Sequence, residues 1–460
     1  IRSGSQTLES HDTPFTIISL VTDPDNMFGT TNGIYVAGSK FAEKDPTGDA
    51  ASFTIPDDTA NVNWKYANFN AQHQTNPDPL GLNWERPVHI EVIDTNGSFE
   101  YGDDAMVRVF GAFSRYKSQK GLALVTRGGY GASALNNAFF GNRTYTSYKS
   151  LTLRPSAMDC FMSKIRDVLI QGLLEDAGSI LPTQAYRRTI VYINGKYWGI
   201  YNLREKVNKY FLAQHYNIGN PDAIDVLVGN GVTEASQISG TNAYLEYKEL
   251  IDWVGSHDLS NPDNYAYIQT KIDVENFAEY CAMEIFVGNT DTGNIKFWKS
   301  AAYDNKSRWI PYDFDWAFNR NDDKSEESTA GYRRDFFKKY FHETGHGVGK
   351  GFSTVLSRGL LKNSNFRALF LQKCAFMYNE VFPTEKMLAR IEALASEMQP
   401  EMNYDTQRWD GFSMKTWERS IENLKDSAKN APEYFLKYCQ SYFSLSDSEM
   451  VQLFGKTSDK

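Results

Sequence analysis

Four polar side chains within one short, mostly apolar stretch of the sequence could do chemistry together. They lie in residues 289–318 among Trp, Tyr, Phe and Ile, and they are Asp291, Asn294, Asp313 and Asp315. Carboxylates crowded on an apolar surface repel one another and lose hydration, which a bound cation normally offsets. Carboxylate and amide oxygens are hard ligands that suit Mg²⁺, Mn²⁺ or Ca²⁺. The stretch therefore predicts a metal and catalytic site.

Two short strands and one helix are predicted to position these side chains. Residues 295–298 and 309–312 have the aromatic and β-branched character of strands, and a polar turn at residues 304–307 separates them. A hairpin of this kind would bring its Asp-bearing ends close together. Residues 273–287 predict a mostly apolar helix, whose C-terminal end would deliver Asp291 to the site.

A structural role for the same acids is the alternative interpretation. Asp291 could belong to the turn that ends a helix after Gly288. Asp313 and Asp315, two residues apart on a strand, would face the same way and could both be solvent-facing. Because acidic clusters also occur in structural networks, residue types alone leave both interpretations open.

The composition describes a large globular chain and limits its partners. With 460 residues the chain exceeds one ordinary core, so we expect a β-rich N-terminal region at residues 1–150 and a remainder at residues 151–460. The formal net charge of -9 argues against nucleic-acid binding through a general phosphate-neutralising surface. No apolar run approaches the length of a membrane span, so we expect no membrane-spanning segment. We also expect the protein to be a monomer.

A basic turn is predicted in the N-terminal region, beyond a long polar interval at residues 40–83. Residues 105–127 predict strand, turn and strand, and the cations near the turn are Arg115, Lys117, Lys120 and Arg127. Small residues beside them would let the backbone approach a ligand, and the cations would neutralise a phosphate. A solvated basic turn is the alternative.

The middle of the chain predicts a helix followed by a hairpin. Helical spacing of apolar residues extends over residues 157–175. Residues 186–205 predict two strands that turn at Asn194-Gly195, a strong hairpin signal. Glu205 at the end of this hairpin is either an ordinary surface charge or the partner that holds a phosphate-binding Lys or Arg in place.

Beyond Asp323 the chain is predicted to be mainly helical. Helical spacing recurs in four segments, at residues 366–378, 384–397, 414–426 and 433–443. An H-E-x-x-H pattern from His342 to His346 has the spacing of a zinc-protease helix. We reject that function, because the glycines crowded into the same stretch disfavour the rigid helix that must present both imidazoles on one face.

Two sequence motifs are specific enough to compare with known families. They are NGKYWGIYNLRE in the central hairpin and WIPYDFDWAF at the acidic site. Further matching stretches cover most of the chain and include NWERPVHIEVID, GAFSRYKSQKGLAL, Ile165-Arg166-Asp167, GNTDTGN and NSNFRALF. Together these stretches resemble the CotH family, the spore-coat-type atypical protein kinases.

The resemblance implies an α+β chain with a divergent protein-kinase-like fold, a β-rich N-terminal lobe and a largely helical C-terminal lobe. It also implies ATP, Mg²⁺ or Mn²⁺, and phosphoryl transfer to a protein acceptor. By position, Asp291 would be the acid near the acceptor hydroxyl. Asn294 and, principally, Asp315 would hold metal, and the acidic cluster read from the residues adds Asp313 to the metal ligands. The residues assigned to nucleotide and phosphate are Lys120, Arg115, Glu205 and Trp309.

Two other functions are kept beside the kinase. The first is a catalytically degenerate member of the family that acts as a surface binding or adhesion module. The second is a carbohydrate-active enzyme that uses two of the Asp residues. The resemblance to the CotH family implies a bacterial protein. We expect export to the cell surface or beyond, because the sequence begins at Ile1 without a signal segment, as it would after removal of a targeting segment.

Overall fold

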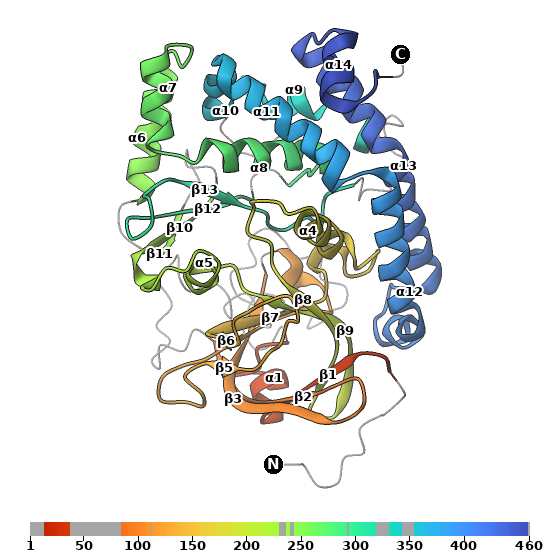
Figure 1. Ribbon diagram of the computed structural model, residues 1–460. Coiled ribbons are helices and arrows are strands. Elements are labelled where there is room, and N and C mark those ends of the chain that lie inside the picture. Colours follow the sequence, from red (N-terminus) through yellow and green to blue (C-terminus); the bar gives the residue numbers. More distant parts are fainter. Residues whose placement is uncertain are drawn as a thin grey trace, which may run out of the picture. The chain divides into compact units, whose positions relative to one another are not determined.

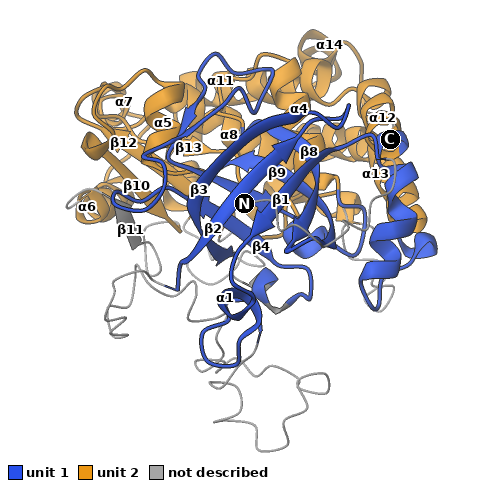
Figure 2. Cartoon of the chain, turned by 90° about the horizontal axis from the view of Figure 1, so that it is seen from below, with its two compact units in different colours: residues 1–164, 184–206, 396–417 blue, residues 165–183, 207–395, 418–460 orange. Residues whose placement is uncertain are grey.

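The computed structural model describes residues 13–36, 84–111, 113–229, 236–239, 243–291, 294–318, 331–342 and 354–458. The polar interval at residues 40–83 and all of the H-E-x-x-H pattern except His342 lie outside this part of the chain. Contacts divide the chain into two units (Figure 2). Unit 1 comprises residues 1–164, 184–206 and 396–417, and unit 2 comprises residues 165–183, 207–395 and 418–460. The predicted α+β class is confirmed.

Seven strands of unit 1 close into a barrel (Figure 1). In barrel order they are β1 Thr16–Val21, β2 Arg86–Ile93, β3 Phe99–Phe110, β4 Gly121–Val125, β7 Ser150–Arg154, β9 Lys196–Glu205 and β8 Tyr186–Ile193. Neighbouring strands are antiparallel, except that β1 and β8 pair in parallel and close the barrel. Along β2 the buried residues alternate as Val88, Ile90 and Val92, which is the pattern of a strand with one face in the core.

The predicted hairpin at residues 186–205 is confirmed as β8 and β9. Asn194 and Gly195 have φ angles of 50° and 78°, and two successive left-handed residues are what the favoured two-residue hairpin turn requires. The Asn194 side chain also accepts a hydrogen bond from the backbone N–H of Thr22, at 2.9 Å. The turn therefore joins the hairpin to the chain that follows β1.

The predicted helix over residues 157–175 is wrong in its first half. Only α4, Arg166–Asp176, is α-helical, and it is preceded by a 3₁₀ turn at Ala157–Asp159. Asp159 accepts hydrogen bonds from the backbone N–H and the hydroxyl of Ser163, and Lys164 has a left-handed φ of 62°. Local side-chain bonds of this kind compete with helix formation, which explains the late start of α4.

Lys164 belongs to a buried ion pair in the core of unit 1. Its ammonium lies 2.6 Å from Asp405 and donates to the side-chain oxygen of Gln119 at 2.8 Å. Both charged side chains are at most 1% exposed. Asp405 also accepts a 2.8 Å hydrogen bond from the backbone N–H of Ile200 on β9. Gly199 is required beside this pair, because a Cβ atom there would lie 2.5 Å from the Asp405 carboxylate.

The other elements of unit 1 are small. They are α1 Pro24–Phe28, a 3₁₀ turn at Phe113–Tyr116, and the two-stranded sheet of β5 Leu135–Asn136 and β6 Ser147–Tyr148. The 3₁₀ turn lies where the basic turn between two strands was predicted, so the strand, turn and strand pattern is confirmed by β3 and β4.

Unit 2 combines a four-stranded antiparallel sheet with helices (Figure 1). The sheet order is β11 Ser236–Ser239, β10 Ile224–Val228, β12 Lys296–Ser300 and β13 Arg308–Ile310. Besides α4 and two long helices described below, the helices are α5 Lys209–His215, α6 Ala243–Ser256, α7 Pro262–Gln269, α8 Val274–Val287, α9 Phe336–Tyr340, α10 Val355–Leu361, α11 Ser364–Phe376 and α14 Asp447–Phe454, with 3₁₀ turns at Pro221–Ala223 and Gly331–Arg333 and a π-helical turn at Met377–Val381. None of the described helices combines the length and the apolar character that a membrane span needs.

Two long helices replace three of the predicted helical segments. α12 extends over Thr384–Arg408 instead of ending at residue 397, and α13 is one helix over Met414–Phe443 instead of two. Pro432 interrupts the hydrogen bonding inside α13, because it has no N–H to donate to the carbonyl of Ala428. The hydroxyl of Thr384 donates to that carbonyl at 3.2 Å, which satisfies the group that proline leaves.

We predict that Asp405→Ala lowers the free energy of unfolding by about 3–5 kcal/mol, because it leaves the Lys164 ammonium buried without its counter-charge. Urea denaturation of the purified chain measures this change. Replacing both partners, as Lys164→Met with Asp405→Leu, should cost less than Asp405→Ala alone.

The matched control is Glu392→Ala. Glu392 lies on α12, the helix that also carries Asp405, and its exposed side chain pairs with Lys425 of α13. An exposed pair contributes at most about 1 kcal/mol. If Asp405→Ala costs no more than this control, the buried pair does not stabilise unit 1 in the way described.

Candidate functional site

Helix α8 carries the chain to Asp291, and its two ends are capped by its own sequence. Asp273 accepts a 3.0 Å hydrogen bond from the backbone N–H of Asn276 at the N-terminus. At the C-terminus Gly288 has a left-handed φ of 58°, and the N–H groups of Gly288 and Asn289 donate to the carbonyls of Ile285 and Glu284. This is the Schellman arrangement that ends helices at glycine. The predicted apolar helix is confirmed.

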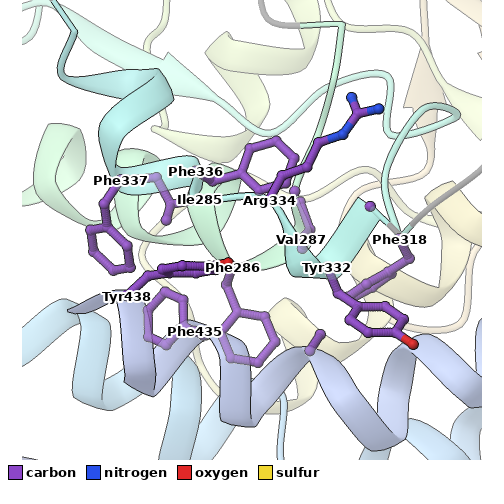
Figure 3. Close-up of a pocket in the computed structure, with 13 residues that line it drawn as sticks. Ile285, Phe286, Val287, Phe318, Tyr332, Arg334, Phe336, Phe337, Phe435 and Tyr438 are labelled. Atoms are coloured by element: carbon purple, nitrogen blue, oxygen red, sulfur yellow. The ribbon is translucent and has the colours of Figure 1, made fainter. Parts of the chain in front are cut away.

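Aromatic side chains fix the C-terminal end of α8 in place. Figure 3 shows Phe286, Phe336 and Phe435 around a cavity of about 20 Å³, room for about one water molecule. A Cβ atom on Gly288 would lie 2.8 Å from the ring of Phe336, so no larger residue fits here without movement. The backbone that leads to Asp291 is therefore held on its apolar side by close packing.

The predicted hairpin beyond Asp291 is confirmed as β12 and β13. Lys296 pairs with Ile310, and Phe297 pairs with Trp309. The side chain of Asn276 on α8 bonds both backbone groups of Trp309, accepting at 2.6 Å and donating at 3.2 Å. This amide ties the helix to the hairpin.

Trp309 lies in the apolar core of unit 2. Its ring centroid is 4.4 Å from that of Phe277 and 5.6 Å from that of Phe297, and the residue is 3% exposed. The assignment of Trp309 to nucleotide binding remains a prediction, and the position of the ring gives it a packing role.

The segment that carries Asp313 and Asp315 is a loop and not a strand, which corrects the expectation that both side chains face the same way. β13 ends at Ile310, and Asp313 has a left-handed φ of 58° that no strand residue adopts. The two residues differ in environment as well. Asp315 is 1% exposed, whereas Asp313 is partly exposed.

The amide of Asn294 brings three of the four predicted residues together. Its Nδ2 atom donates to Asp313 Oδ2 at 2.7 Å and to Asp291 Oδ2 at 3.3 Å, and its backbone N–H donates to the carbonyl of Asp291 at 3.1 Å. Two carboxylates from opposite ends of the stretch therefore face one amide. Asp315 lies two residues beyond Asp313 on the same loop.

The donor set fits a small divalent cation in type. Carboxylate oxygens and an amide oxygen are hard ligands, and Mg²⁺ is commonly held by one or two carboxylates with water and phosphate completing its shell. The NH₂ group of Asn294 faces both acids in this structure. For a cation to bind between the acids, the amide would have to rotate so that its oxygen faces the cation. Within the described ranges, no group of three or more His, Cys, Asp or Glu side chains could hold a metal ion.

Glu284 is a buried acid near enough to Asp291 for the two charges to interact. Burial raises the pKa of its carboxyl to about 7, and the nearby charge of Asp291 acts in the same direction. Hydrogen bonds from Tyr340, Asn289 and Tyr280 oppose this shift, and the Tyr340 bond measures 3.1 Å. Asn289 in turn accepts a 3.1 Å hydrogen bond from the backbone N–H of Asp291. Asn289 therefore links Glu284 to the backbone of Asp291.

Asp167 was not identified from the sequence as a site residue, although it contacts the acidic loop. Its carboxylate accepts a 3.2 Å hydrogen bond from the backbone N–H of Phe314, the residue between Asp313 and Asp315. The available signal was the adjacent charged pair Arg166-Asp167 in an otherwise apolar run of sequence. Both side chains are almost fully buried, which is unusual for charged residues and indicates fixed partners.

The basic turn of unit 1 holds Lys120 in its interior. The Lys120 ammonium donates to the carbonyl oxygens of Arg115 at 2.7 Å and Lys117 at 2.9 Å, and the residue is 5% exposed. Burial lowers the pKa of Lys120 to about 7. The structure thus gives Lys120 a role in closing the turn, and its contact with phosphate, like that of Arg115, remains a prediction.

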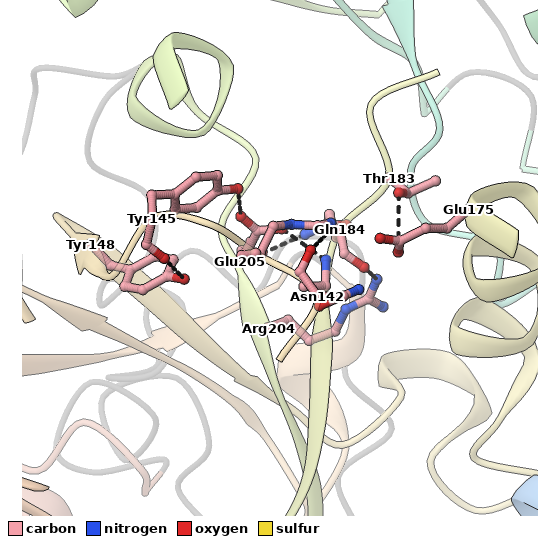
Figure 4. A network of polar contacts seen from close by, with 10 residues as sticks. Asn142, Tyr145, Tyr148, Glu175, Thr183, Gln184, Arg204 and Glu205 are labelled. Atoms are coloured by element: carbon pink, nitrogen blue, oxygen red, sulfur yellow. Dashed lines mark hydrogen bonds and ion pairs between the residues drawn. The ribbon is translucent and has the colours of Figure 1, made fainter. Parts of the chain in front are cut away.

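Glu205 at the end of β9 holds an arginine, as one of its two interpretations expected. Its carboxylate accepts from Nε of Arg143 at 2.9 Å and from the backbone N–H of Ala185 at 2.8 Å. It also accepts from the hydroxyl of Tyr145 (Figure 4). Glu205 and Arg143 are 2% and 8% exposed, so Glu205 is not an ordinary surface charge. Arg143 was not singled out in the sequence.

Comparison with known families supports the resemblance that the sequence motifs indicated. Residues 107–435 match the family described as CotH kinase protein. The chain belongs to the CotH kinase family. The match contains all eight residues assigned to the site and most of unit 2, and family membership suggests a kinase-like phosphotransferase. A search of curated proteins finds no match to this chain.

We predict that Glu284 makes the stability of the CotH-family chain depend on pH. Its pKa is higher in the folded chain, about 7, than its ordinary value of 4.5, so the folded state binds this proton more tightly. The free energy of unfolding should fall by roughly 1–3 kcal/mol as pH rises from about 4.5 to about 7, and stay level above. Glu284→Gln should remove this part of the slope in urea denaturation at a series of pH values.

Glu275→Gln is the matched control, because Glu275 lies on the same helix with its side chain 55% exposed. In Glu275→Gln the free energy of unfolding should depend on pH as it does in the wild type. If Glu284→Gln also keeps the wild-type dependence, protonation of Glu284 does not contribute to the stability of the chain.

Proposed function

We propose that this protein transfers the γ-phosphoryl group of ATP to a hydroxyl group of a protein acceptor, with Mg²⁺ or Mn²⁺ as its metal. The observation that carries the proposal is the bonding of one amide, that of Asn294, to the two carboxylates of Asp291 and Asp313. Phosphoryl transfer depends mainly on positioning and on neutralising charge. An acid beside the acceptor hydroxyl would position that hydroxyl. Neighbouring oxygen ligands would hold a cation that neutralises the charge of the phosphates.

Each acidic residue receives one role in this proposal. Asp291 orients the acceptor hydroxyl and takes its proton as the phosphoryl group moves. Asn294, Asp313 and Asp315 hold the cation, and Asp315 is the principal ligand. The bound cation supplies neutralisation of the charge on the phosphate oxygens. Lys120, Arg115, the Glu205–Arg143 pair and Trp309 are proposed contacts for nucleotide and phosphate.

The first test concerns metal. We predict that nucleotide binding requires a divalent cation and that Asp315→Asn weakens it at least about tenfold, because the variant keeps the shape of the side chain and removes its charge. Calorimetry with ATP in Mg²⁺, in Mn²⁺ and in EDTA measures the effect. Asp252→Asn is the matched control, since Asp252 is an exposed acid on α6. Equal binding in EDTA would contradict the metal assignment.

The second test concerns chemistry. We predict that Asp291→Asn lowers turnover by roughly 10²–10⁴, the usual contribution of a positioned acid or base, while ATP affinity stays within a few-fold of wild type. Labelled ATP with casein-like acceptors, and with the protein itself as acceptor, gives the rate. A variant that transfers phosphate at the wild-type rate would remove this role from Asp291. A wild-type chain inert toward every acceptor would favour a binding module.

A further inference from the structure

The loop at residues 311–318 carries two of the proposed metal ligands without the hydrogen-bonding ladder of a strand. Contacts from outside the loop hold five of its backbone groups. The groups and their partners are Phe314 N–H with Asp167, Ala317 C=O with Arg166, Trp316 C=O with Thr290, Phe318 N–H with Val287 C=O, and Phe318 C=O with Ser427. Of these five contacts, only the one with Asp167 bonds the residue between Asp313 and Asp315.

Asp167 is itself fixed at the start of α4. It is the second residue of the helix and 4% exposed, and the partial positive charge of a helix N-terminus stabilises a carboxylate there. Gln171, one turn later, donates to the two carboxylate oxygens at 3.2 and 3.4 Å. The bonds from Gln171 and Phe314 together restrict the rotation of the carboxylate.

The bond to Phe314 controls how the two acids of the loop are presented. Phe314 is fully buried, and its neighbour Asp313 has a left-handed φ of 58°, a conformation that costs a non-glycine residue free energy. A strained backbone persists only where its surroundings determine it. Without an acceptor for the Phe314 N–H, the loop would lose the contact that fixes the peptide group between Asp313 and Phe314.

We propose that Asp167 is a positioning residue that pre-orders the Asp313–Asp315 loop for divalent metal. The inference rests on the proposed function, because it takes Asp313 and Asp315 as metal ligands. Asp167 does not contact the reacting groups in this proposal. It lowers the free-energy cost of metal binding by holding the loop, before any metal arrives, in the arrangement that the cation needs.

The experiment compares two substitutions at Asp167 by titrating the nucleotide-free full chain with Mn²⁺ in a calorimeter. Asp167→Ala removes the acceptor and should weaken Mn²⁺ binding about tenfold or more. Asp167→Asn keeps an oxygen that can accept from Phe314, and Gln171 can turn its amide to match. This second variant should stay within about threefold of wild type.

A kinetic measurement separates positioning from simple loss of structure. In phosphoryl transfer, Asp167→Ala should raise the Mn²⁺ concentration for half-maximal rate by a similar factor, while the rate at saturating Mn²⁺ stays within a few-fold of wild type, because the bound cation then orders the loop. Asp176→Ala is the matched control. Asp176 lies on the same helix, is 62% exposed and pairs with Arg390, so Mn²⁺ binding should not change.

Each outcome has one meaning. Unchanged Mn²⁺ binding in Asp167→Ala overturns the inference, and so does an equal loss in Asp167→Ala and Asp167→Asn, because charge and not the hydrogen bond would then be responsible. If Asp167→Ala does not fold, Asp167→Asn and Gln171→Leu decide, and Gln171→Leu should weaken Mn²⁺ binding by a few-fold. Asp315→Asn tests the site itself: if that variant binds Mn²⁺ like wild type, the proposed metal site fails independently of Asp167.

Discussion

The left-handed backbone at Gly288 is the constraint on which the candidate site depends. α8 is buried along nearly its whole length, so the direction in which the chain leaves it cannot be adjusted by tilting the helix. Gly288 reverses that direction against the ring of Phe336, and only a residue without Cβ fits both the φ angle and the contact. The packing of Gly288 against Phe336 thus determines the course of the backbone that leads to Asp291. Further along the chain, the Asn294 amide bonds both Asp291 and Asp313.

The parts of the fold that the sequence predicted correctly are those with strong local signals. Asn194-Gly195 specifies a two-residue turn almost by itself, and the apolar run of α8 between Asp273 and Gly288 contains both of its caps. One failure lies where local side-chain bonds compete with a helix, because Asp159 accepts two hydrogen bonds from Ser163 and α4 begins only at Arg166. Another lies where a distant side chain contributes, because the Thr384 hydroxyl bonds the carbonyl that Pro432 leaves without a donor in α13.

The same distinction applies to the site. Residue type was enough to single out Asp291, Asn294 and Asp313 as candidates, because acids and amides within an apolar stretch stand out. Residue type could not show that the loop leaves the strand after Ile310, since φ at Asp313 is set by contacts with other parts of unit 2. Asp167 lies well over a hundred residues before its bonding partner Phe314, and one sequence carries no signal for such a pair.

The buried pair of Lys164 and Asp405 has a consequence for the order in which the chain acquires structure during synthesis. The barrel cannot close until β8 has been made and can pair with β1. Lys164 cannot form its ion pair until the ribosome has added Asp405 near the end of the chain. At ~5–20 residues per second, the 241 residues from Lys164 to Asp405 take roughly 12–48 s to make. Unit 1 is therefore the first unit to begin translation, but it cannot complete its core until residues 396–417 have been made, and until then the Lys164 ammonium lacks its counter-charge.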